Sequence, residues 1–351
     1  MRSQAEPMAK TALITGVTGQ DGAYLVRLLL DKGYKVFGTE RGDNAAGRAR
    51  LQWLGVADAF TMLQLELTDA GQIQRVLDRA APDEIYNLAA HSFVHSSFEQ
   101  PIHSGEVSGL AVARILEELR NRHATAHFYQ ASTSELFGNA RTSPQDEETP
   151  FHPRSPYAIA KLYAHHITVN YREAFGLHAS CGILFNHESP LRPPQFITRK
   201  VTLALARMAL GEDRVLEVGN LEAARDWGFA GDYVEGMWRM VQQAEANDYV
   251  LATGQAHTVR QLIEIAAGAV GIAIDWHGDG AGTEGRDRRT GRLMVRVNPA
   301  FYRPADINLT VGNPAKAASR LGWRAKVGFE GLVGMMIEAD LTRLKAGQII
   351  V

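Results

Sequence analysis

A glycine-rich turn near the N-terminus constrains the fold of this chain more than any other feature. Gly16, Gly19 and Gly22 stand between a short apolar run, residues 10–15, and an amphipathic stretch, residues 23–32. The run predicts a buried strand and the stretch predicts a helix. Glycines at these offsets let the backbone approach a pyrophosphate, whose negative charge the helix N-terminus stabilises. The sequence therefore predicts the first strand–turn–helix unit of a dinucleotide-binding fold.

Strand-like and helix-like segments continue to alternate up to residue 185. The expected strands cover residues 34–39, 60–65, 84–89, 127–131 and 180–185, and the expected helices cover residues 70–80, 109–122 and 155–175. Helices that connect such strands make the strands parallel, in right-handed units. The predicted fold class is α/β: a Rossmann-type doubly wound parallel sheet with a smaller α/β C-terminal substrate lobe.

The pattern becomes less regular after residue 185. Three prolines interrupt residues 190–194, and residues 211–228 are expected to be rich in loops. Residues 278–292, rich in Gly, Arg and Asp, are expected to form a loop that is mobile without ligand. One strand at 249–252 should return to the sheet, followed by a helix at 259–270. We therefore expect a dinucleotide-binding domain of residues 1–185 with about 225–255, and a second lobe of residues 186–224 and 256–351.

Composition excludes several classes of protein. With 351 residues the chain is long enough for one large or two fused domains, and its formal net charge of -2 does not suggest a nucleic-acid partner. No apolar run is long enough to span a bilayer, and the N-terminus lacks the apolar core of a signal peptide. We therefore expect a cytoplasmic protein without a membrane partner. Cys181, the single cysteine, cannot form an internal disulfide and is expected to be a buried strand thiol.

Four residues in the middle of the chain form a catalytic pattern. Tyr157 and Lys161 are four positions apart in a predicted helix, so they share one face, and the lysine charge favours the tyrosinate. A tyrosine activated in this way can remove the proton of an alcohol that is being oxidised. Thr133 follows a predicted strand at the sheet edge where ligands bind, and could hydrogen-bond the same oxygen. Glu135 could remove a second proton, which oxidation followed by elimination requires and oxidation alone does not.

The same residues also have structural interpretations. Thr133 and Ser134 are residue types that commonly cap helices, and Glu135 could be an exposed acid in a first helical turn. A Tyr–Lys pair four positions apart also occurs by chance on helix surfaces. We favour the catalytic interpretation because all the residues of the pattern follow one predicted strand.

The end of the second predicted strand carries two residues with opposite implications for the cofactor. An acid at this position, here Glu40, accepts from the 2′-hydroxyl of NAD, whereas an arginine, here Arg41, pairs with the 2′-phosphate of NADP. Arg48 or Arg50 could serve in place of Arg41. Both residues could also be a solvated loop tip, so this signal leaves the choice open.

Longer segments around these residues carry a family resemblance. They read TGVTGQDG (15–22), FYQASTSELFG (128–138), PFHPRSPYAIAKLYA (150–164), GILFNHESP (182–190), ARDWGFAGDYVE (224–235) and FYRPADI (301–307). On these segments the chain resembles the extended short-chain dehydrogenases/reductases and, within them, the GDP-mannose 4,6-dehydratase family, from about residue 10 to about residue 344. The glutamate after Thr133-Ser134 discriminates within the superfamily, because epimerases and simple reductases usually lack it.

The resemblance implies a complete reaction, the conversion of GDP-mannose to GDP-4-keto-6-deoxymannose. Tyr157 removes the 4-hydroxyl proton, Lys161 holds the nicotinamide ribose and tunes the tyrosine, and Thr133 positions O4. Hydride passes from C4 to the cofactor, Glu135 takes the C5 proton, water leaves from C6, and the hydride returns to C6. The cofactor is regenerated in each cycle and should be tightly held. NADP is the implied cofactor, with NAD the alternative because of Glu40.

The same resemblance implies two sets of binding residues. The cofactor set is Gly16, Gly19, Gln20, Asp21, Gly22, Arg41, Glu66, Leu67, Leu88, Ala89, Tyr157, Lys161 and His187. The set for the sugar nucleotide, assigned mainly to the second lobe, is Ser92, Asn186, Lys200, Gly219, Arg225, Arg303 and Asp306. Arginines can bind phosphate oxygens bidentately and a carboxylate can accept from guanine N–H groups. Without the resemblance, Arg225 and Asp226 would be interpreted as a surface ion pair.

The chain departs from the family after its second strand, where two successive arginines are usual. Here Arg41 is preceded by Glu40 and followed by Gly42, which weakens the implication of NADP. His91 and His95 have a metal-compatible spacing, but no further ligand completes a set, so no metal site is expected. The family usually forms a homodimer or homotetramer through the helices predicted at 109–122 and 155–175.

Three other functions are compatible with parts of the pattern. One is a dehydratase for another GDP-sugar such as a heptose, since the sugar is hardly encoded at this level. Another is a reductase of GDP-4-keto-6-deoxy sugars, against which Glu135 argues. The third is a non-catalytic sensor of nucleotide sugars or dinucleotides, which would have no need of Thr133, Glu135, Tyr157 and Lys161 together.

Overall fold

The computed structural model describes residues 9–301 and 309–348, which form two compact units. The first unit contains residues 9–136, 151–183 and 234–249, and the second contains 137–150, 184–233 and the described residues from 250 onward. Residues 137–150, which we expected in the dinucleotide-binding domain, belong to the second unit. None of the described helices combines the length and apolar character needed to cross a membrane.

A seven-stranded sheet has the strand order expected of a Rossmann fold. The order is β11-β6-β5-β4-β1-β2-β3, and β1 pairs in parallel with both β2 and β4. Strand order therefore reverses between β1 and β4, the switch point at which such sheets bind ligands. The strands are β1 (Thr11–Thr15), β2 (Lys35–Glu40), β3 (Thr61–Gln64), β4 (Glu84–Asn87), β5 (His127–Thr133), β6 (Ala179–Leu184) and β11 (Tyr249–Leu251). The predicted fold class is confirmed, and Cys181 is a fully buried thiol in β6 as expected.

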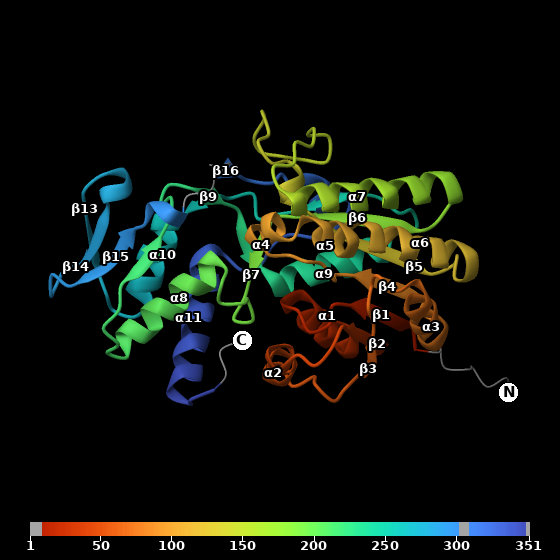
Figure 1. Cartoon of the computed structure of the whole chain (residues 1–351), viewed down its shortest axis with the longest axis horizontal. Coiled ribbons are helices and arrows are strands. Elements are labelled where there is room, and N and C mark those ends of the chain that lie inside the picture. The colour runs from red at the N-terminus through yellow and green to blue at the C-terminus, as the bar shows by residue number, and fades with distance from the viewer. Residues whose placement is uncertain (1–8, 302–308, 349–351) are drawn as a thin grey trace. The chain divides into compact units, whose positions relative to one another are not determined.

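The helices of the first unit follow the strands in alternation. They are α1 (Gln20–Asp31), α2 (Ala45–Trp53), α3 (Ala70–Ala80), α4 (Val94–Glu99), α5 (Pro101–Gly105), η1 (Glu106–Leu110), α6 (Ala111–Arg122) and α7 (Pro156–Phe175), while α9 (Ala230–Val241) continues into this unit from the second. Helices α6 and α7 pack against each other, side by side in Figure 1. Leu13, Ile85, Phe128 and Leu116 form part of the core that the strands share with α3 and α6.

Local sequence explains why α7, the helix that carries Tyr157 and Lys161, begins and ends where it does. The Ser155 hydroxyl caps its start by accepting from the backbone N–H of Ala158 at 3.1 Å, and Pro156 occupies the first turn. Gly176 ends the helix with φ of 70°, in the left-handed region that favours glycine. Both signals are local in the sequence, and they place the first residue of the helix, Pro156, directly before Tyr157.

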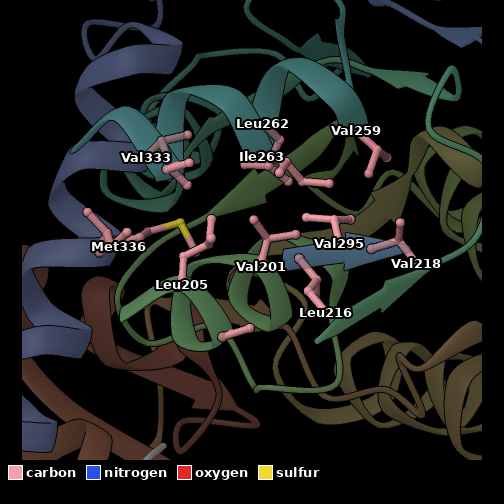
Figure 2. Packing of buried hydrophobic residues seen from close by; sticks show 14 of the residues in the cluster. Val201, Leu205, Leu216, Val218, Val259, Leu262, Ile263, Val295, Val333 and Met336 are labelled. Atoms are coloured by element: carbon pink, nitrogen blue, oxygen red, sulfur yellow. The ribbon is translucent and has the colours of Figure 1, made fainter. Parts of the chain in front are cut away.

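The second unit has its own core. Helices α8 (Ile197–Ala209), α10 (Val259–Ala269) and α11 (Phe329–Lys345) pack on a four-stranded sheet of β13 (Ile274–His277), β14 (Glu284–Asp287), β15 (Leu293–Val297) and β8 (Leu216–Val218). Figure 2 shows Val201 and Leu205 of α8, Leu262 of α10, Val295 of β15 and Met336 of α11 meeting in this core. Shorter pairs lie elsewhere in the unit: β7 (Asn186–Glu188) with β10 (Trp227–Phe229), and β9 (Ala224–Arg225) between β12 (His257–Thr258) and β16 (Leu309–Thr310).

The prediction that residues 278–292 form a loop is wrong for residues 284–287, which form β14. Strands β13 and β14 form an antiparallel hairpin, and β14 pairs in turn with β15. Gly278 and Gly280 have positive φ and make the turn between β13 and β14, whereas Gly285 lies in β14 itself. A Cβ atom on Gly285 would lie 2.9 Å from the side chains of Ile274 and Trp276. The glycines therefore mark a tight turn and close packing between strands.

Candidate active site

The glycine turn is formed as predicted, and a different physical constraint favours glycine at each of its three positions. Gly16 has φ of 69°, and a Cβ there would lie 2.9 Å from the Cα atom of Ala89. A Cβ on Gly22 would lie 2.6 Å from backbone atoms of Gly16 and Val17, so only glycine lets α1 approach the turn this closely. Gly19 is the N-cap of α1 and has no side chain to cover the backbone N–H groups of the first helical turn. This cradle fits a pyrophosphate.

Hydrogen bonds tie the glycine turn to the ends of the central strands. The Thr15 hydroxyl accepts from the backbone N–H groups of Leu88 and Ala89, both at 3.1 Å, and donates to Asn87 at 2.7 Å. The Asn87 amide then donates to the Gln130 side chain at 2.8 Å. The ends of β1, β4 and β5 are thus held together, and the predicted cofactor residues Leu88 and Ala89 lie against the turn.

Glu40 and Arg41, at the end of β2, differ sharply in burial. Glu40 is only 8% exposed, and its Oε2 atom has no hydrogen-bond partner among the described residues. Arg41 is exposed, with Nη1 3.4 Å from Nε2 of His103. The glycine turn lies beside this strand end, because the backbone N–H of Val17 donates to the Thr39 carbonyl at 3.2 Å. A buried carboxylate oxygen therefore lies unpaired near the turn.

The other predicted cofactor residues of the first unit lie close to these strand ends. Leu67 is buried, whereas the Glu66 carboxylate accepts from the backbone N–H and hydroxyl of Thr68 at 3.2 and 3.1 Å. In the first turn of α1, the Gln20 amide donates to the Asp21 carboxylate at 3.1 Å.

Lys161 and Tyr157 are both buried on α7, 3% and 8% exposed respectively. The Lys161 ammonium donates to the Ala131 carbonyl at 2.8 Å. Burial lowers the pKa of Lys161 to about 8, while the nearby Asp21 carboxylate acts to raise it. Asp21, in the first turn of α1, thus lies near Lys161 of α7. An ammonium has three N–H groups, so with one described acceptor it keeps donors for a ligand.

Thr133 and Glu135 lie where β5 ends and the short helix η2 (Ser134–Leu136) begins. The Thr133 hydroxyl accepts from the Glu135 backbone N–H at 3.3 Å, so it does contribute a local cap. Both side chains are half-buried, and α7 packs on β5 and η2. The structure thus brings all four predicted catalytic residues to the C-terminal end of β5 and the first turns of α7, within one unit.

The predicted sugar-nucleotide residues of the second unit lie on several elements. Asn186 is in β7, next to the predicted cofactor residue His187, whose ring has Nδ1 2.7 Å from the Phe185 carbonyl oxygen. Lys200 and Gly219 both face Phe301: the ammonium is 4.2 Å from the ring centroid, and a Cβ on Gly219 would lie 2.9 Å from the Phe301 carbonyl oxygen. Arg303 and Asp306 lie outside the described residues, and Ser92 is exposed in the first unit.

The interpretation of Arg225 and Asp226 as a surface ion pair is wrong. Asp226 is fully buried, and its carboxylate accepts from the backbone N–H groups of Thr253, Gly254 and Gly312 and from the Thr253 hydroxyl, at 2.6 to 3.2 Å. Burial raises the pKa of this carboxyl group, although the hydrogen bonds act to lower it. Asp226 therefore anchors the backbone on which half-buried Arg225 stands, a role that no local sequence pattern indicates.

Sequence reasoning also missed a buried polar contact beside the catalytic residues. The Ser132 hydroxyl lies 3.0 Å from Nδ1 of His165, and both side chains are at most 4% exposed. The two residues are 33 positions apart, so no local sequence pattern indicates this contact.

Comparison with known proteins identifies a matching family and similar relatives. The family model described as GDP-mannose 4,6 dehydratase matches residues 13–336. A protein of Sinorhizobium fredii named GDP-mannose 4,6-dehydratase is 48% identical over 344 residues, which cover 96% of this chain and 98% of that protein.

Solved structures share the fold at lower identity. UDP-glucose 4-epimerase of Thermus thermophilus, complexed with NAD, has a TM-score of 0.77 and 24% identity over 94% of this chain and 98% of its own. RMD from Pseudomonas aeruginosa, complexed with NADPH, has a TM-score of 0.75 and 20% identity over 95% of this chain and 100% of its own. With a matching family model over most of its length and a relative this similar over nearly the whole chain, the protein belongs to the GDP-mannose 4,6-dehydratase family.

Proposed function

We propose that the chain catalyses the 4,6-dehydration of GDP-mannose, giving GDP-4-keto-6-deoxymannose. The observation that carries this proposal is the position of Glu135: it is the second residue of η2, which follows β5 directly, and the helix of Tyr157 and Lys161 packs on both elements. A carboxylate beside an activated tyrosine suits a reaction that removes two protons from one sugar. Family membership supports the same reaction.

In the oxidation step, Tyr157 is the base. Its phenolate takes the proton of the sugar 4-hydroxyl while the Thr133 hydroxyl, half-buried at the end of β5, hydrogen-bonds O4. The Lys161 ammonium, oriented by the Ala131 carbonyl at 2.8 Å, favours the phenolate electrostatically and keeps N–H donors for the ribose of the cofactor. A bound nicotinamide dinucleotide supplies the redox chemistry by taking the hydride from C4 and returning it to C6.

In the elimination step, Glu135 is the base. The C4 ketone acidifies the proton on C5, and the Glu135 carboxylate removes it and passes it to the departing C6 hydroxyl, which leaves as water. The proton that Tyr157 took from the 4-hydroxyl balances the one that C5 gains when hydride returns to C6. The backbone N–H of Glu135 donates to Thr133, so the two side chains that meet the sugar are held by one tight turn. Positioned acid–base groups of this kind contribute about 10²- to 10⁴-fold in rate.

The GDP moiety is assigned to residues of the second unit. Positive charge for the diphosphate comes from Lys200 and from Arg225, whose backbone Asp226 anchors. The rest of the set consists of Asn186, Gly219, Arg303 and Asp306. The first unit would hold the dinucleotide through its glycine turn, with Ser92 at the sugar. His187 is assigned to the nicotinamide.

We propose NAD, the alternative named above, in preference to NADP. The Glu40 carboxylate is buried with an unpaired oxygen at the end of β2, which suits a 2′-hydroxyl donor and repels a 2′-phosphate. Arg48 is in an ion pair with Asp43, and Arg50 is buried and donates to the Thr18 carbonyl at 3.1 Å. Arg41 alone supports NADP, and its exposed side chain would have to pair with a phosphate placed beside Glu40.

Dinucleotide titrations would test the cofactor choice. Protein stripped of nucleotide should bind NAD about tenfold more tightly than NADP or better. Glu40→Ser should reduce or reverse the preference, and Arg41→Ser should leave it nearly unchanged. Tighter binding of NADP that Arg41→Ser abolishes would restore the NADP assignment.

We also propose a homodimer formed through the face of η1 and α7. Leu110, Ile159 and Tyr163 are 42%, 58% and 42% exposed on these adjacent elements, and Ile102 on α5 is 82% exposed. Large apolar side chains gathered in this way mark an association surface, and a second copy of the chain would bury it. Light scattering should give a dimer or tetramer, and Ile102→Lys with Ile159→Lys should give a monomer.

Incubation of the purified protein with GDP-mannose, without added cofactor, tests the function directly. The expected result is a product that has lost one water and carries a 4-keto group. A GDP-heptose converted in preference to GDP-mannose would shift the substrate assignment. Reduction of a GDP-4-keto-6-deoxy sugar by added NADPH, with no dehydration, would favour the reductase instead.

A further inference from the structure

A buried polar network lies directly behind the catalytic residues and is not used in the reaction steps above. Ser132 of β5 contacts Nδ1 of His165 at 3.0 Å, and Nε2 of His165 lies 4.0 Å from the Asp248 carboxylate. Arg172 holds that carboxylate bidentately at 2.8 and 2.9 Å. The backbone N–H of Cys181 donates to it as well, at 3.2 Å.

The charge states of this network can be assigned from its surroundings. Burial lowers the pKa of His165 to about 4, opposed by the Asp248 carboxylate, so the imidazole is neutral at physiological pH. A neutral imidazole has one donor and one acceptor nitrogen. The carboxylate beside Nε2 favours the proton on that nitrogen, which leaves Nδ1 to accept from the Ser132 hydroxyl. The Ser132–His165 hydrogen bond thus has a defined direction, while the Asp248 carboxylate acts on Nε2 electrostatically across 4.0 Å.

The network has the residue types of a nucleophilic triad and of a metal site, but its geometry excludes both. Nε2 of His165 lies 4.0 Å from Asp248, too far for the hydrogen bond that orients the base of a nucleophilic triad. His165, Cys181 and Asp248 bring potential ligand atoms within 4.8 Å of one another. The guanidinium of Arg172 already neutralises Asp248, however, and a cation placed there would be repelled by it.

The network instead connects the two elements that carry the catalytic groups. Ser132 lies between Ala131 and Thr133 on the chain, and the Ala131 carbonyl accepts from Lys161. His165 is four residues after Lys161 on α7, one helical turn further along the same face. Two consecutive residues of β5 are therefore bonded to two consecutive turns of one face of α7. These bonds fix how far α7 can slide along β5.

We propose that His165 is a positioning residue that sets the register of α7 on β5, and hence the spacing of Tyr157 and Lys161 from Thr133. This inference rests on the proposed function for its effect on turnover. Misplacement of reacting groups by about 1 Å can reduce a rate by about 10²-fold. His165 contacts neither substrate nor cofactor and would act only through this register.

Variants at position 165 and its neighbour test the proposal. His165→Leu removes the bond to Ser132, whereas His165→Asn keeps a polar group that can reach it. His166→Leu is the matched control, because His166 is exposed but makes a similar edge-to-face contact with Phe151, at 5.8 Å against 5.2 Å for His165. The assays are kcat and KM for GDP-mannose, the thermal midpoint, and the affinity of nucleotide-free protein for NAD and NADP.

The expected pattern separates positioning from stability. His165→Leu should lower kcat by about tenfold or more with KM changed less than about twofold, and weaken dinucleotide binding by about threefold through Lys161. His165→Asn should recover most of both losses, and Ser132→Ala combined with His165→Leu should lose little more than either alone. His166→Leu should behave as the parent.

Two outcomes would overturn the inference. One is a folded His165→Leu variant with parental kcat and parental dinucleotide affinity. The other is a loss that His165→Asn does not rescue and that follows the thermal midpoint, which would mean a purely structural role. A parent protein inactive on GDP-mannose would instead refute the proposed function, and the dinucleotide affinities would still test the positioning role.

Discussion

The Lys161 ammonium donates a 2.8 Å hydrogen bond to the carbonyl oxygen of Ala131, which joins the second turn of α7 to the end of β5. Both residues are at least nine-tenths buried. Because burial disfavours the charged amine, the pKa of Lys161 falls to about 8, although the Asp21 carboxylate opposes the change. The protein therefore holds a positive charge where it is unfavourable for folding and where, in the proposed mechanism, it would favour the Tyr157 phenolate.

Lys161→Met should consequently stabilise the nucleotide-free protein while abolishing dehydration. The pKa of Lys161 is about 8 in the folded state and 10.5 in the unfolded chain, so its charge lowers the free energy of unfolding by about 3 kcal/mol at neutral pH. Loss of the hydrogen bond to Ala131 offsets about 1 kcal/mol of the gain. Urea unfolding at neutral pH should show the variant to be about 2 kcal/mol more stable than the parent.

The pH dependence of this difference has a definite sign. Between pH 8 and 10.5 the unfolded chain binds the lysine proton and the folded protein does not, so the parent gains stability with rising pH relative to Lys161→Met. The advantage of the variant should shrink over that window. A variant that is no more stable at neutral pH, or an advantage that is constant with pH, would contradict the assignment of a buried, destabilising charge.

Glu135→Gln should separate the two proton transfers of the proposed reaction. The amide cannot accept the C5 proton, so product formation should fall by about 10³-fold or more. Tyr157 and Lys161 are unchanged, so mixing with GDP-mannose should still reduce some bound nicotinamide, seen as absorbance of the reduced cofactor. Glu118→Gln, a half-buried acid on α6 of the same unit, is the control and should behave as the parent. Normal product formation by Glu135→Gln would remove this residue from the mechanism.

The sheet could be predicted because its signals are local. Strand β6 is buried throughout and is mostly apolar in sequence, and α7 carries its own cap, Pro156 and terminal glycine. Helix α11 was missed for a tertiary reason. It buries Asp340 completely in an ion pair with Arg199 at 2.6 Å, so a charged residue stands where an amphipathic pattern requires an apolar one.

In the candidate site, too, local signals could be recognised in the sequence and tertiary contacts could not. Tyr157 and Lys161 could be placed from sequence because helical spacing alone puts them on one face. The contact of Ser132 with His165 joins positions 33 residues apart and leaves no periodic signal. The anchoring of Asp226 by Gly254 and Gly312 is likewise a product of the folded chain, which is why the adjacent Arg225 suggested a simple surface pair.

Two glycines of the first turn offer a matched pair of variants. A Cβ on Gly22 would lie 2.6 Å from backbone atoms that cannot move aside, so Gly22→Ala should lower the free energy of unfolding by about 1–3 kcal/mol. A Cβ on Gly19 would meet only the Gly16 carbonyl oxygen, at 3.2 Å, so Gly19→Ala should fold with nearly parental stability. Its methyl group would cover the start of α1, and dinucleotide affinity should fall about tenfold or more. Parental affinity in Gly19→Ala would place the pyrophosphate elsewhere.

Arg225 and Asp226 should have separable effects on GDP binding and on stability. Arg225→Ala removes a half-buried guanidinium proposed to bind the diphosphate, and should weaken GDP binding about tenfold or more with the thermal midpoint nearly unchanged. Asp226→Ala instead leaves the buried N–H groups of Gly254 and Gly312 without an acceptor, and should lower the free energy of unfolding by about 2–4 kcal/mol. GDP titration and urea unfolding of both variants give the comparison. Arg225→Ala with parental GDP affinity would remove Arg225 from the nucleotide site, whereas Asp226→Ala with parental stability would show that the loops hold β9 without the carboxylate.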